Sequence, residues 1–119
     1  FDFKAAFPSV AHPFLISCLE HLGLPNAAMN FVRSMYDDNK CCVRIQGQDF
    51  AGFHLKGGVR QGCPLSPLLF AVCVDILLRM IELHLGKGNV NAFADDIAAT
   101  IADFTTQGPG LESIFHDFD

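Results

Sequence analysis

The sequence predicts an α+β fold in which helices pack on one face of an antiparallel sheet. Hydrophobic residues recur at helical spacing in several segments, and short apolar runs separated by turn residues indicate two β-hairpins. These segments follow one another in the order strand, two helices, hairpin, helix, hairpin. Such an order is typical of helices layered against an antiparallel sheet.

The composition is that of a single globular domain. Half of the 119 residues are hydrophobic and 18% are charged, a balance that argues against disorder. No apolar run approaches the roughly 18 residues of a membrane span, and no secretion signal opens the chain. The five cysteines show no C-x-x-C spacing, so we expect reduced thiols, most of them packed as small hydrophobic side chains. These features favour an intracellular protein, in the cytoplasm or the nucleus, without a membrane partner.

The first half of the chain is predicted to be mainly helical. Residues 1–7 form a short apolar run that Pro8 ends, as expected of a buried strand. Apolar residues at steps of three and four predict an amphipathic helix over residues 11–22, with Gly23 as its stop. A second helix of the same kind is predicted to begin near Pro25 or Asn26 and to end before residue 40.

The second half contains two predicted hairpins around a long helix. The polar residues 46–49 separate the strands of the first hairpin. Ser66 is expected to cap the long helix, which tolerates Pro67 in its first turn and ends near Leu85. Residues 90–94 and 97–101 are predicted to form a strand–turn–strand unit, and a last helix is expected over 111–118.

Asp95 and Asp96 are the most informative pair of residues. Adjacent carboxylates between apolar strands are costly unless a cation neutralises them, and oxygen ligands of this kind suit Mg²⁺. A solvated turn is the alternative, because aspartate is a favoured turn residue. The other pair, Asp37 and Asp38, lies in a polar stretch after a predicted helix and is expected to be solvated.

Asp2 is a third candidate metal ligand, since it lies between two phenylalanines in the first predicted strand. If that strand lies beside the late hairpin, three carboxylates converge and can hold two divalent ions. Two such ions would stabilise the attacking and leaving oxygens of a displacement at phosphorus. An exposed position of Asp2 is the alternative interpretation.

A glycine-rich stretch, residues 57–62, precedes the long helix. Glycines let the backbone approach a ligand and expose its N–H groups, and Arg60 and Gln61 add donors beside them. The stretch therefore indicates a loop that contacts a phosphate or nucleotide, with an ordinary connector as the alternative. The net charge of −5 is opposite in sign to a typical nucleic-acid-binding surface and argues against autonomous binding.

The sequence resembles reverse transcriptases, and the residues of its motifs are most similar to those of non-LTR (LINE-type) retrotransposons. Three palm motifs occur in the order of the family: Phe1-Asp2-Phe3-Lys4-Ala5-Ala6-Phe7, then Gly58-Val59-Arg60-Gln61-Gly62-Cys63-Pro64-Leu65-Ser66-Pro67-Leu68-Leu69-Phe70, then Phe93-Ala94-Asp95-Asp96. The resemblance covers nearly the whole chain. It implies that residues 1–119 form a partial reverse transcriptase domain, a fragment with the palm core and without fingers and thumb.

The resemblance also implies roles for individual residues. The metal ligands would be Asp2, Asp95 and Asp96, which match the aspartates that hold two Mg²⁺ ions, with Mn²⁺ as a possible substitute. The substrate-binding residues would be Phe7, which matches the bulky residue that rejects a ribose 2′-hydroxyl, and Arg60, Gln61 and Gly62, which match the incoming-nucleotide and template pocket. Pro8 departs from the family pattern, because many relatives have an aspartate there.

The implied activity is RNA-directed DNA polymerisation by two-metal nucleotidyl transfer. Its partners would be an RNA template, a DNA primer and deoxynucleoside triphosphates, bound by a longer parent protein; the isolated chain is expected to show little or no activity. Two other interpretations stay open. One is a different palm-type nucleotidyl enzyme such as a cyclase, although a cyclase would not need the middle motif. The other is an inactive retroelement remnant that serves at most as a folded or interaction module.

Overall fold

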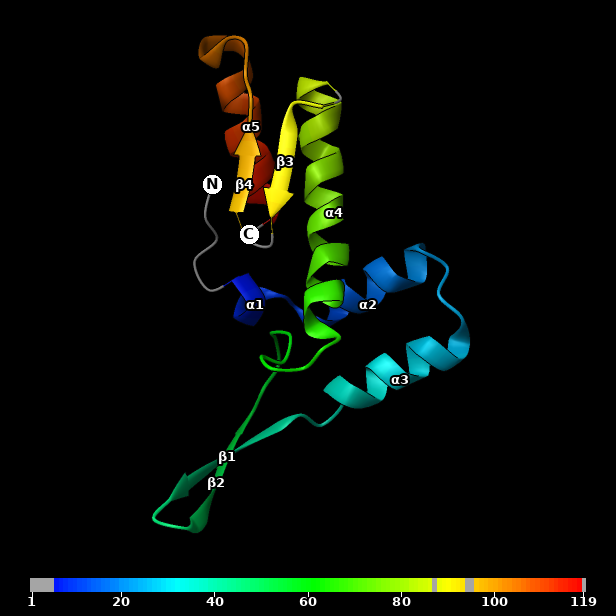
Figure 1. Ribbon diagram of the computed structural model, residues 1–119, viewed down its shortest axis with the longest axis vertical. Coiled ribbons are helices and arrows are strands. Elements are labelled where there is room, and N and C mark those ends of the chain that lie inside the picture. Colours follow the sequence, from blue (N-terminus) through cyan, green and yellow to red (C-terminus); the bar gives the residue numbers. More distant parts are fainter. Residues whose placement is uncertain (1–5, 87, 94–95, 119) are drawn as a thin grey trace.

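The computed structural model describes residues 6–86, 88–93 and 96–118, and within these ranges helices and antiparallel strands alternate (Figure 1). The predicted α+β class is therefore confirmed. The elements are α1 (Ala6–Ser9), α2 (His12–His21), α3 (Asn26–Tyr36), β1 (Lys40–Ile45), β2 (Gln48–His54), α4 (Ser66–Leu85), β3 (Val90–Phe93), β4 (Asp96–Ala99) and α5 (Phe104–Phe118).

The strands of the described ranges form two separate ribbons of two antiparallel strands each. β1 pairs with β2, and β3 pairs with β4. The predicted single sheet with helices on one face is not found in these ranges; residues 1–5, most of the predicted first strand, lie outside them. The β3–β4 ribbon lies along α4, with α5 also against α4, so this ribbon is the one that helices cover (Figure 1).

α4 is the central element of the hydrophobic core. α2 packs on it near its start, and α5 and β3 pack along the rest of its length. Its predicted bounds are confirmed, and Gly86, with φ of 93°, follows its last turn. No helix in the described part of the chain is long and apolar enough to cross a membrane. The residues that α4 buries are Ser66, Leu69, Phe70, Cys73, Val74, Leu77, Ile81 and Leu85.

Ser66 is buried at the start of α4 but does not cap the helix, so this prediction is wrong. Its hydroxyl donates a hydrogen bond to the carbonyl of Arg60, whereas a capping serine accepts a bond from a backbone N–H of the first turn. The N-cap position belongs to Leu65, which makes no side-chain cap. A buried hydroxyl needs a partner, and here the preceding loop supplies it.

Two further predictions differ from the structure. Ala6 and Phe7 begin the short helix α1 instead of continuing a strand. α5 begins at Phe104, earlier than the predicted 111–118, because Asp103 caps it: the backbone N–H of Thr105 donates to Asp103 Oδ1 at 2.9 Å. Hydrogen bonds from Thr105 and Thr106 hold the pKa of Asp103 below its usual value.

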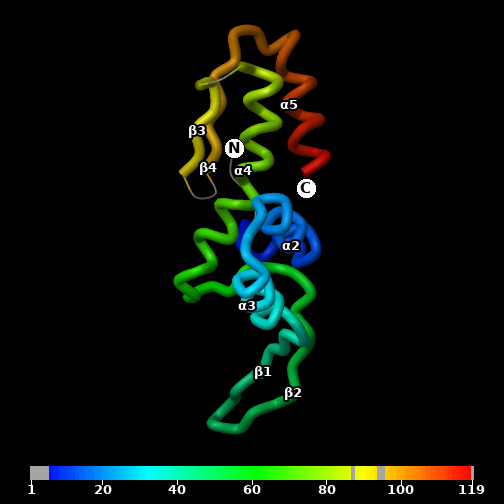
Figure 2. The backbone as a smooth tube through the Cα atoms, turned by 90° about the vertical axis from the view of Figure 1, so that its right-hand side faces the viewer, coloured from blue at the N-terminus to red at the C-terminus, as the bar shows by residue number. Residues whose placement is uncertain are grey.

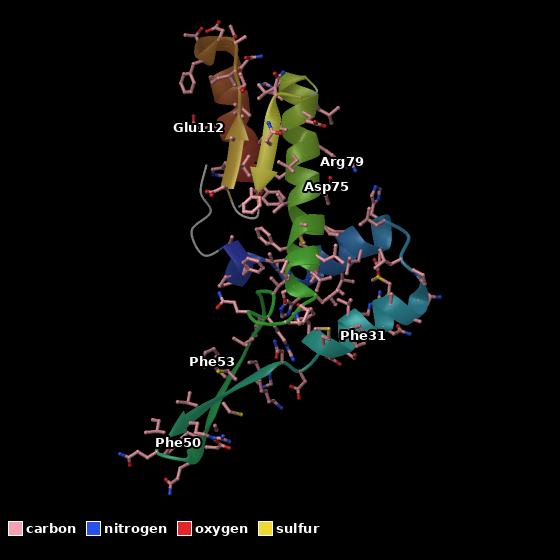
Figure 3. All side chains as sticks on the ribbon, in the orientation of Figure 1. Phe31, Phe50, Phe53, Asp75, Arg79 and Glu112 are labelled. Carbon is pink, nitrogen blue, oxygen red and sulfur yellow. The ribbon has the colours of Figure 1, made fainter. Side chains whose placement is uncertain are left out.

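The β1–β2 hairpin projects from the body of the molecule (Figures 1 and 2). Gln46 and Gly47, with φ of 50° and 81°, form a two-residue turn, as the twist of paired strands favours. The predicted four-residue connection is therefore too long. Figure 3 shows Phe50 and Phe53 on this hairpin, and both are about half exposed or more. The radius of gyration of 17.2 Å exceeds the roughly 13 to 14 Å of a compact domain of this length.

All five cysteines are free thiols, and two of them belong to the core. Cys18 of α2 and Cys73 of α4 are buried and hydrogen-bonded to one another. Burial is the largest cause that raises the pKa of Cys73 to about 12. Cys41 and Cys63 are half-buried and Cys42 is exposed. Two of the five cysteines are therefore fully packed, fewer than the expected majority.

Two leucines of α4 allow a matched test of this core. Leu77 is 0% exposed and Leu83 is 88% exposed. We expect Leu77→Ala to lower the free energy of unfolding by about 2 to 5 kcal/mol, because it removes buried methyl groups and leaves a cavity. Leu83→Ala should change it by less than about 0.5 kcal/mol. Urea titrations of the two variants measure the difference, and equal losses would contradict the burial assigned to α4.

Candidate functional site

The glycine-rich loop (residues 57–65) lies against the turn between α1 and α2. The backbone N–H of Gly58 donates to the carbonyl of Val10 at 2.7 Å, and that of Val59 donates to the carbonyl of Phe7 at 2.9 Å. These hydrogen bonds join the chain segments that carry the first and the middle sequence motifs. Phe7, the last residue of the first motif, and Val59 of the middle motif are therefore in contact although they are far apart in the sequence.

Gly58 is required where the two segments approach most closely. Its φ of 88° lies in the left-handed region, and a Cβ at this position would lie 3.0 Å from Pro8 Cα and 3.1 Å from the Pro8 carbonyl oxygen. Both neighbours are backbone atoms, so they could not move aside without displacing the chain. At Gly58 the close neighbour is the protein's own backbone, and the predicted approach of this stretch to a ligand stays a prediction.

His12, in the first turn of α2, forms a hydrogen bond to the same loop. Its Nε2 donates to the carbonyl of Gly58 at 2.9 Å; a carbonyl can only accept, so this nitrogen carries the proton. The imidazole also lies 4.7 Å, centroid to centroid, from the ring of Tyr36 at the end of α3. The Tyr36 hydroxyl is buried and has no hydrogen-bond partner among the described atoms.

The side chain of Arg60 points toward the end of α3. Its Nη2 donates to the carbonyl of Met35 at 2.7 Å and to Asn39 Oδ1 at 2.9 Å. Its own carbonyl accepts the hydrogen bond from Ser66 described above. Arg60 therefore connects the loop to α3 through its side chain and to α4 through its backbone.

A pocket of about 450 Å³ opens between α1, the loop and the start of α4. The four residues predicted to contact a nucleotide all line it: Phe7 from α1, and Arg60, Gln61 and Gly62 from the loop. The Phe7 ring stacks on that of Phe70 at a centroid distance of 4.8 Å and an interplanar angle of 23°. This contact with the core fixes the ring at the edge of the pocket. The other lining residues are Cys63, Pro64, Ser66 and Pro67.

Of the three predicted metal ligands, the structure describes Asp96. It is the exposed first residue of β4 and pairs with Phe93 of β3. Asp2 and Asp95 lie outside the described residues, and among the residues described no group of three or more histidine, cysteine, aspartate or glutamate side chains lies close enough to hold a metal ion. The convergence of the three carboxylates therefore stays a prediction.

Asp96, as the first residue of β4, lies at one end of the β3–β4 ribbon. β3 ends and β4 begins at the ribbon end nearer α1 in both views (Figures 1 and 2). α1 also supplies Phe7 to the pocket. The described carboxylate thus lies at the ribbon end that is nearer the helix supplying Phe7.

His12 and Asn39 are the site residues that sequence reasoning missed. A signal for His12 existed, because it precedes the buried Leu15 by three residues and Leu19 by seven, which places it on the inner face of an amphipathic helix. A polar residue on that face needs a partner in the interior. Asn39 lies in a polar stretch between α3 and β1, and nothing in its sequence context distinguishes it from a solvated residue.

Comparison with known proteins gives a family match over residues 1–117, described as reverse transcriptase (RNA-dependent DNA polymerase). The Retrovirus-related Pol polyprotein from type-2 retrotransposable element R2DM of Drosophila melanogaster is 32% identical over 102 residues, which cover 81% of this chain and 10% of that protein. A Pol polyprotein from type-1 retrotransposable element R2 of Popillia japonica is 31% identical over 105 residues, covering 81% and 15%.

A third relative is the probable RNA-directed DNA polymerase from transposon BS of Drosophila melanogaster. It is 31% identical over 100 residues, which cover 82% of this chain and 11% of the relative. The chain therefore spans about 10 to 15% of the length of these three relatives.

Two glycines of the loop allow a test of the close approach at Gly58. Gly58 and Gly62 both have a positive φ, of 88° and 83°, but among the described residues a Cβ at Gly62 would meet nothing within 4 Å beyond its chain neighbours. We expect Gly62→Ala to lower the free energy of unfolding by roughly 1 kcal/mol through backbone strain alone. Gly58→Ala should cost about 2 to 4 kcal/mol, because the added methyl group also meets the Pro8 backbone. Thermal unfolding monitored by circular dichroism compares them, and equal losses would argue against the close approach.

Proposed function

This chain belongs to the reverse transcriptase family, and we propose that it forms the palm core of an RNA-directed DNA polymerase from a non-LTR retroelement. The family match over residues 1–117 is the observation that carries the proposal. Because the chain spans only a small part of its relatives, the proposed activity is that of a longer protein that contains it. Its substrates would be an RNA template, a DNA primer and deoxynucleoside triphosphates, inside the cell.

The proposed reaction adds one deoxynucleotide to the primer. The 3′-oxygen of the primer loses its proton and forms a bond to the α-phosphorus of the triphosphate. The bond from this phosphorus to the oxygen that bridges the α- and β-phosphates breaks, and pyrophosphate leaves with that oxygen. Catalysis of such a displacement rests on positioning of the reactants and on stabilisation of developing charge.

The pocket beside α1 is the proposed site of the incoming nucleotide. Phe7 would lie against the sugar, and its stacking on Phe70 keeps the ring from moving aside for a 2′-hydroxyl. Gln61 and Gly62 would line the place where the base meets the template. Gly62 leaves open space there, since no other described residue beyond its chain neighbours has an atom within 4 Å of the position of a Cβ. The pocket residues thus suit a nucleotide that lacks the 2′-hydroxyl.

Asp2, Asp95 and Asp96 are the residues that we propose as ligands of two Mg²⁺ ions, for which Mn²⁺ could substitute. Carboxylate oxygens are the ligands that Mg²⁺ prefers, and the exposed position of Asp96 at the ribbon end nearer α1 is compatible with this role. Bound ions of this kind would neutralise charge on the attacking and leaving oxygens.

A longer protein that carries this chain allows a test of the aspartate assignment by primer extension on an RNA template. We expect Asp95→Ala to abolish extension, because the site loses a metal ligand. The matched control is Asp37→Ala, since Asp37 is exposed and lies after α3 in an aspartate pair. Retained extension by Asp95→Ala would overturn the assignment. Nucleotide turnover that needs no primer would instead point to another palm-type nucleotidyl enzyme.

Phe7 provides a separate test, of sugar selection. In the same assay we expect Phe7→Val to raise the ratio of ribonucleotide to deoxynucleotide incorporation by roughly tenfold or more, because about 1 to 3 kcal/mol of steric rejection is lost. Phe14→Val is the control, since Phe14 belongs to α2 and does not line this pocket. An unchanged ratio in Phe7→Val would remove Phe7 from the proposed site.

A further inference from the structure

We propose that Arg60 is a positioning residue, which holds the glycine-rich loop in place from the end of α3, and that its guanidinium does not bind the phosphates of the nucleotide. Its place at the pocket invites the opposite assignment, because arginine is a common phosphate ligand. This inference rests on the proposed function, since it concerns how the proposed nucleotide pocket is built.

The hydrogen bonds of Arg60 leave no pair of N–H groups free to bind a phosphate through two bonds at once. Nη2 carries two hydrogens, and its two acceptors are the Met35 carbonyl at 2.7 Å and Asn39 Oδ1 at 2.9 Å. A guanidinium can form a two-pronged contact along either of two edges, Nη1–Nη2 or Nε–Nη2. Both edges include Nη2. With Nη2 engaged, Arg60 cannot bind a phosphate in this way without releasing α3.

The acceptors of Arg60 are groups that need such a donor. α3 ends at Tyr36, so the Met35 carbonyl is one of the last four of the helix, which lack a partner within it. A positive charge at this end of a helix is also favourable. Asn39 directly precedes β1. Its backbone carbonyl accepts a hydrogen bond from the backbone N–H of Leu55, just after β2, at 2.8 Å. Arg60 therefore contacts both the end of α3 and the base of the hairpin.

The same residue fixes the backbone that leads into the pocket. The Arg60 carbonyl accepts from the buried Ser66, and the preceding residue, Val59, is buried and bonded to Phe7. Gln61 and Gly62, which line the pocket, follow at once. Three hydrogen-bonding groups thus fix the loop: the Arg60 side chain, the Arg60 carbonyl and the N–H of Val59. The position of Gln61 depends on them.

A double-mutant cycle with Asn39 separates positioning from direct phosphate binding. In a longer protein that carries this chain, we would measure the affinity for a 2′-deoxynucleoside triphosphate with Mg²⁺ by calorimetry, for wild type, Arg60→Met, Asn39→Ala and the double variant. Asn39→Ala leaves the arginine charge in place. We expect each single variant to bind roughly three- to tenfold more weakly, and the double variant no more weakly than Arg60→Met alone, because both changes remove one interaction.

Arg44→Met is the control for charge. Arg44 is exposed on the hairpin and paired with Asp49 at 2.6 Å, so this variant removes the same charge from a residue outside the pocket lining. Its affinity should stay within about twofold of wild type, because exposed charges contribute little at moderate salt. If Asn39→Ala binds like wild type while Arg60→Met does not, or if the two losses multiply, Arg60 acts on the nucleotide directly and the proposal is wrong.

Amide hydrogen exchange of the unliganded chain decides the same question without a nucleotide. The N–H groups of Gly58 and Val59 are hydrogen-bonded in the structure, and we expect both to exchange several-fold faster in Arg60→Met and in Asn39→Ala, while the core amides of α4 keep their rates. Unchanged exchange in both variants would overturn the positioning role. A longer wild-type protein that binds no triphosphate would count against the proposed function instead, and the exchange rates would still decide the role of Arg60.

Discussion

The backbone hydrogen bonds between the α1–α2 turn and the glycine-rich loop are the interaction on which the site depends. They bring Phe7 beside Gln61 and Gly62, and they exist because Gly58 lets two backbones approach to contact distance. A single methyl group at that position would separate the two halves of the pocket. His12 of α2 bonds to the loop, and Arg60 of the loop bonds to the end of α3. With the bond from Val59 to Phe7 of α1, three helices determine the shape of one short segment.

Elements whose signal is local were predictable from the sequence. α2, α3 and α4 follow from apolar spacing, and both hairpins follow from turn residues between apolar runs. The predictions from sequence are wrong where a tertiary contact determines the local structure. Ser66 donates to Arg60 rather than capping α4, and Phe7 enters a helical turn rather than a strand. The start of α5 was missed because Asp103 defines it through a cap, ahead of the apolar periodicity.

The candidate site was predictable in its residues but not in its construction. The motifs named Phe7, Arg60, Gln61 and Gly62, which the fold brings to one pocket. No sequence pattern predicts that the Arg60 guanidinium is directed at the end of α3, because its direction depends on how the loop and the helix pack. The meeting of Asp2 with Asp95 and Asp96 stays a prediction, because it depends on residues outside the described ranges.

The projecting hairpin has a consequence for how this chain behaves in solution. In the described part of the chain, β1 and β2 pair with each other and with no third strand, so the outer edge of each presents unpaired backbone groups to water. Apolar side chains such as Phe50 and Phe53 are exposed beside these edges. Strands of other molecules can add to an edge of this kind. The hairpin is therefore the part of the described chain at which self-association is expected to begin, and the exposed Arg44–Asp49 ion pair places polar groups on it.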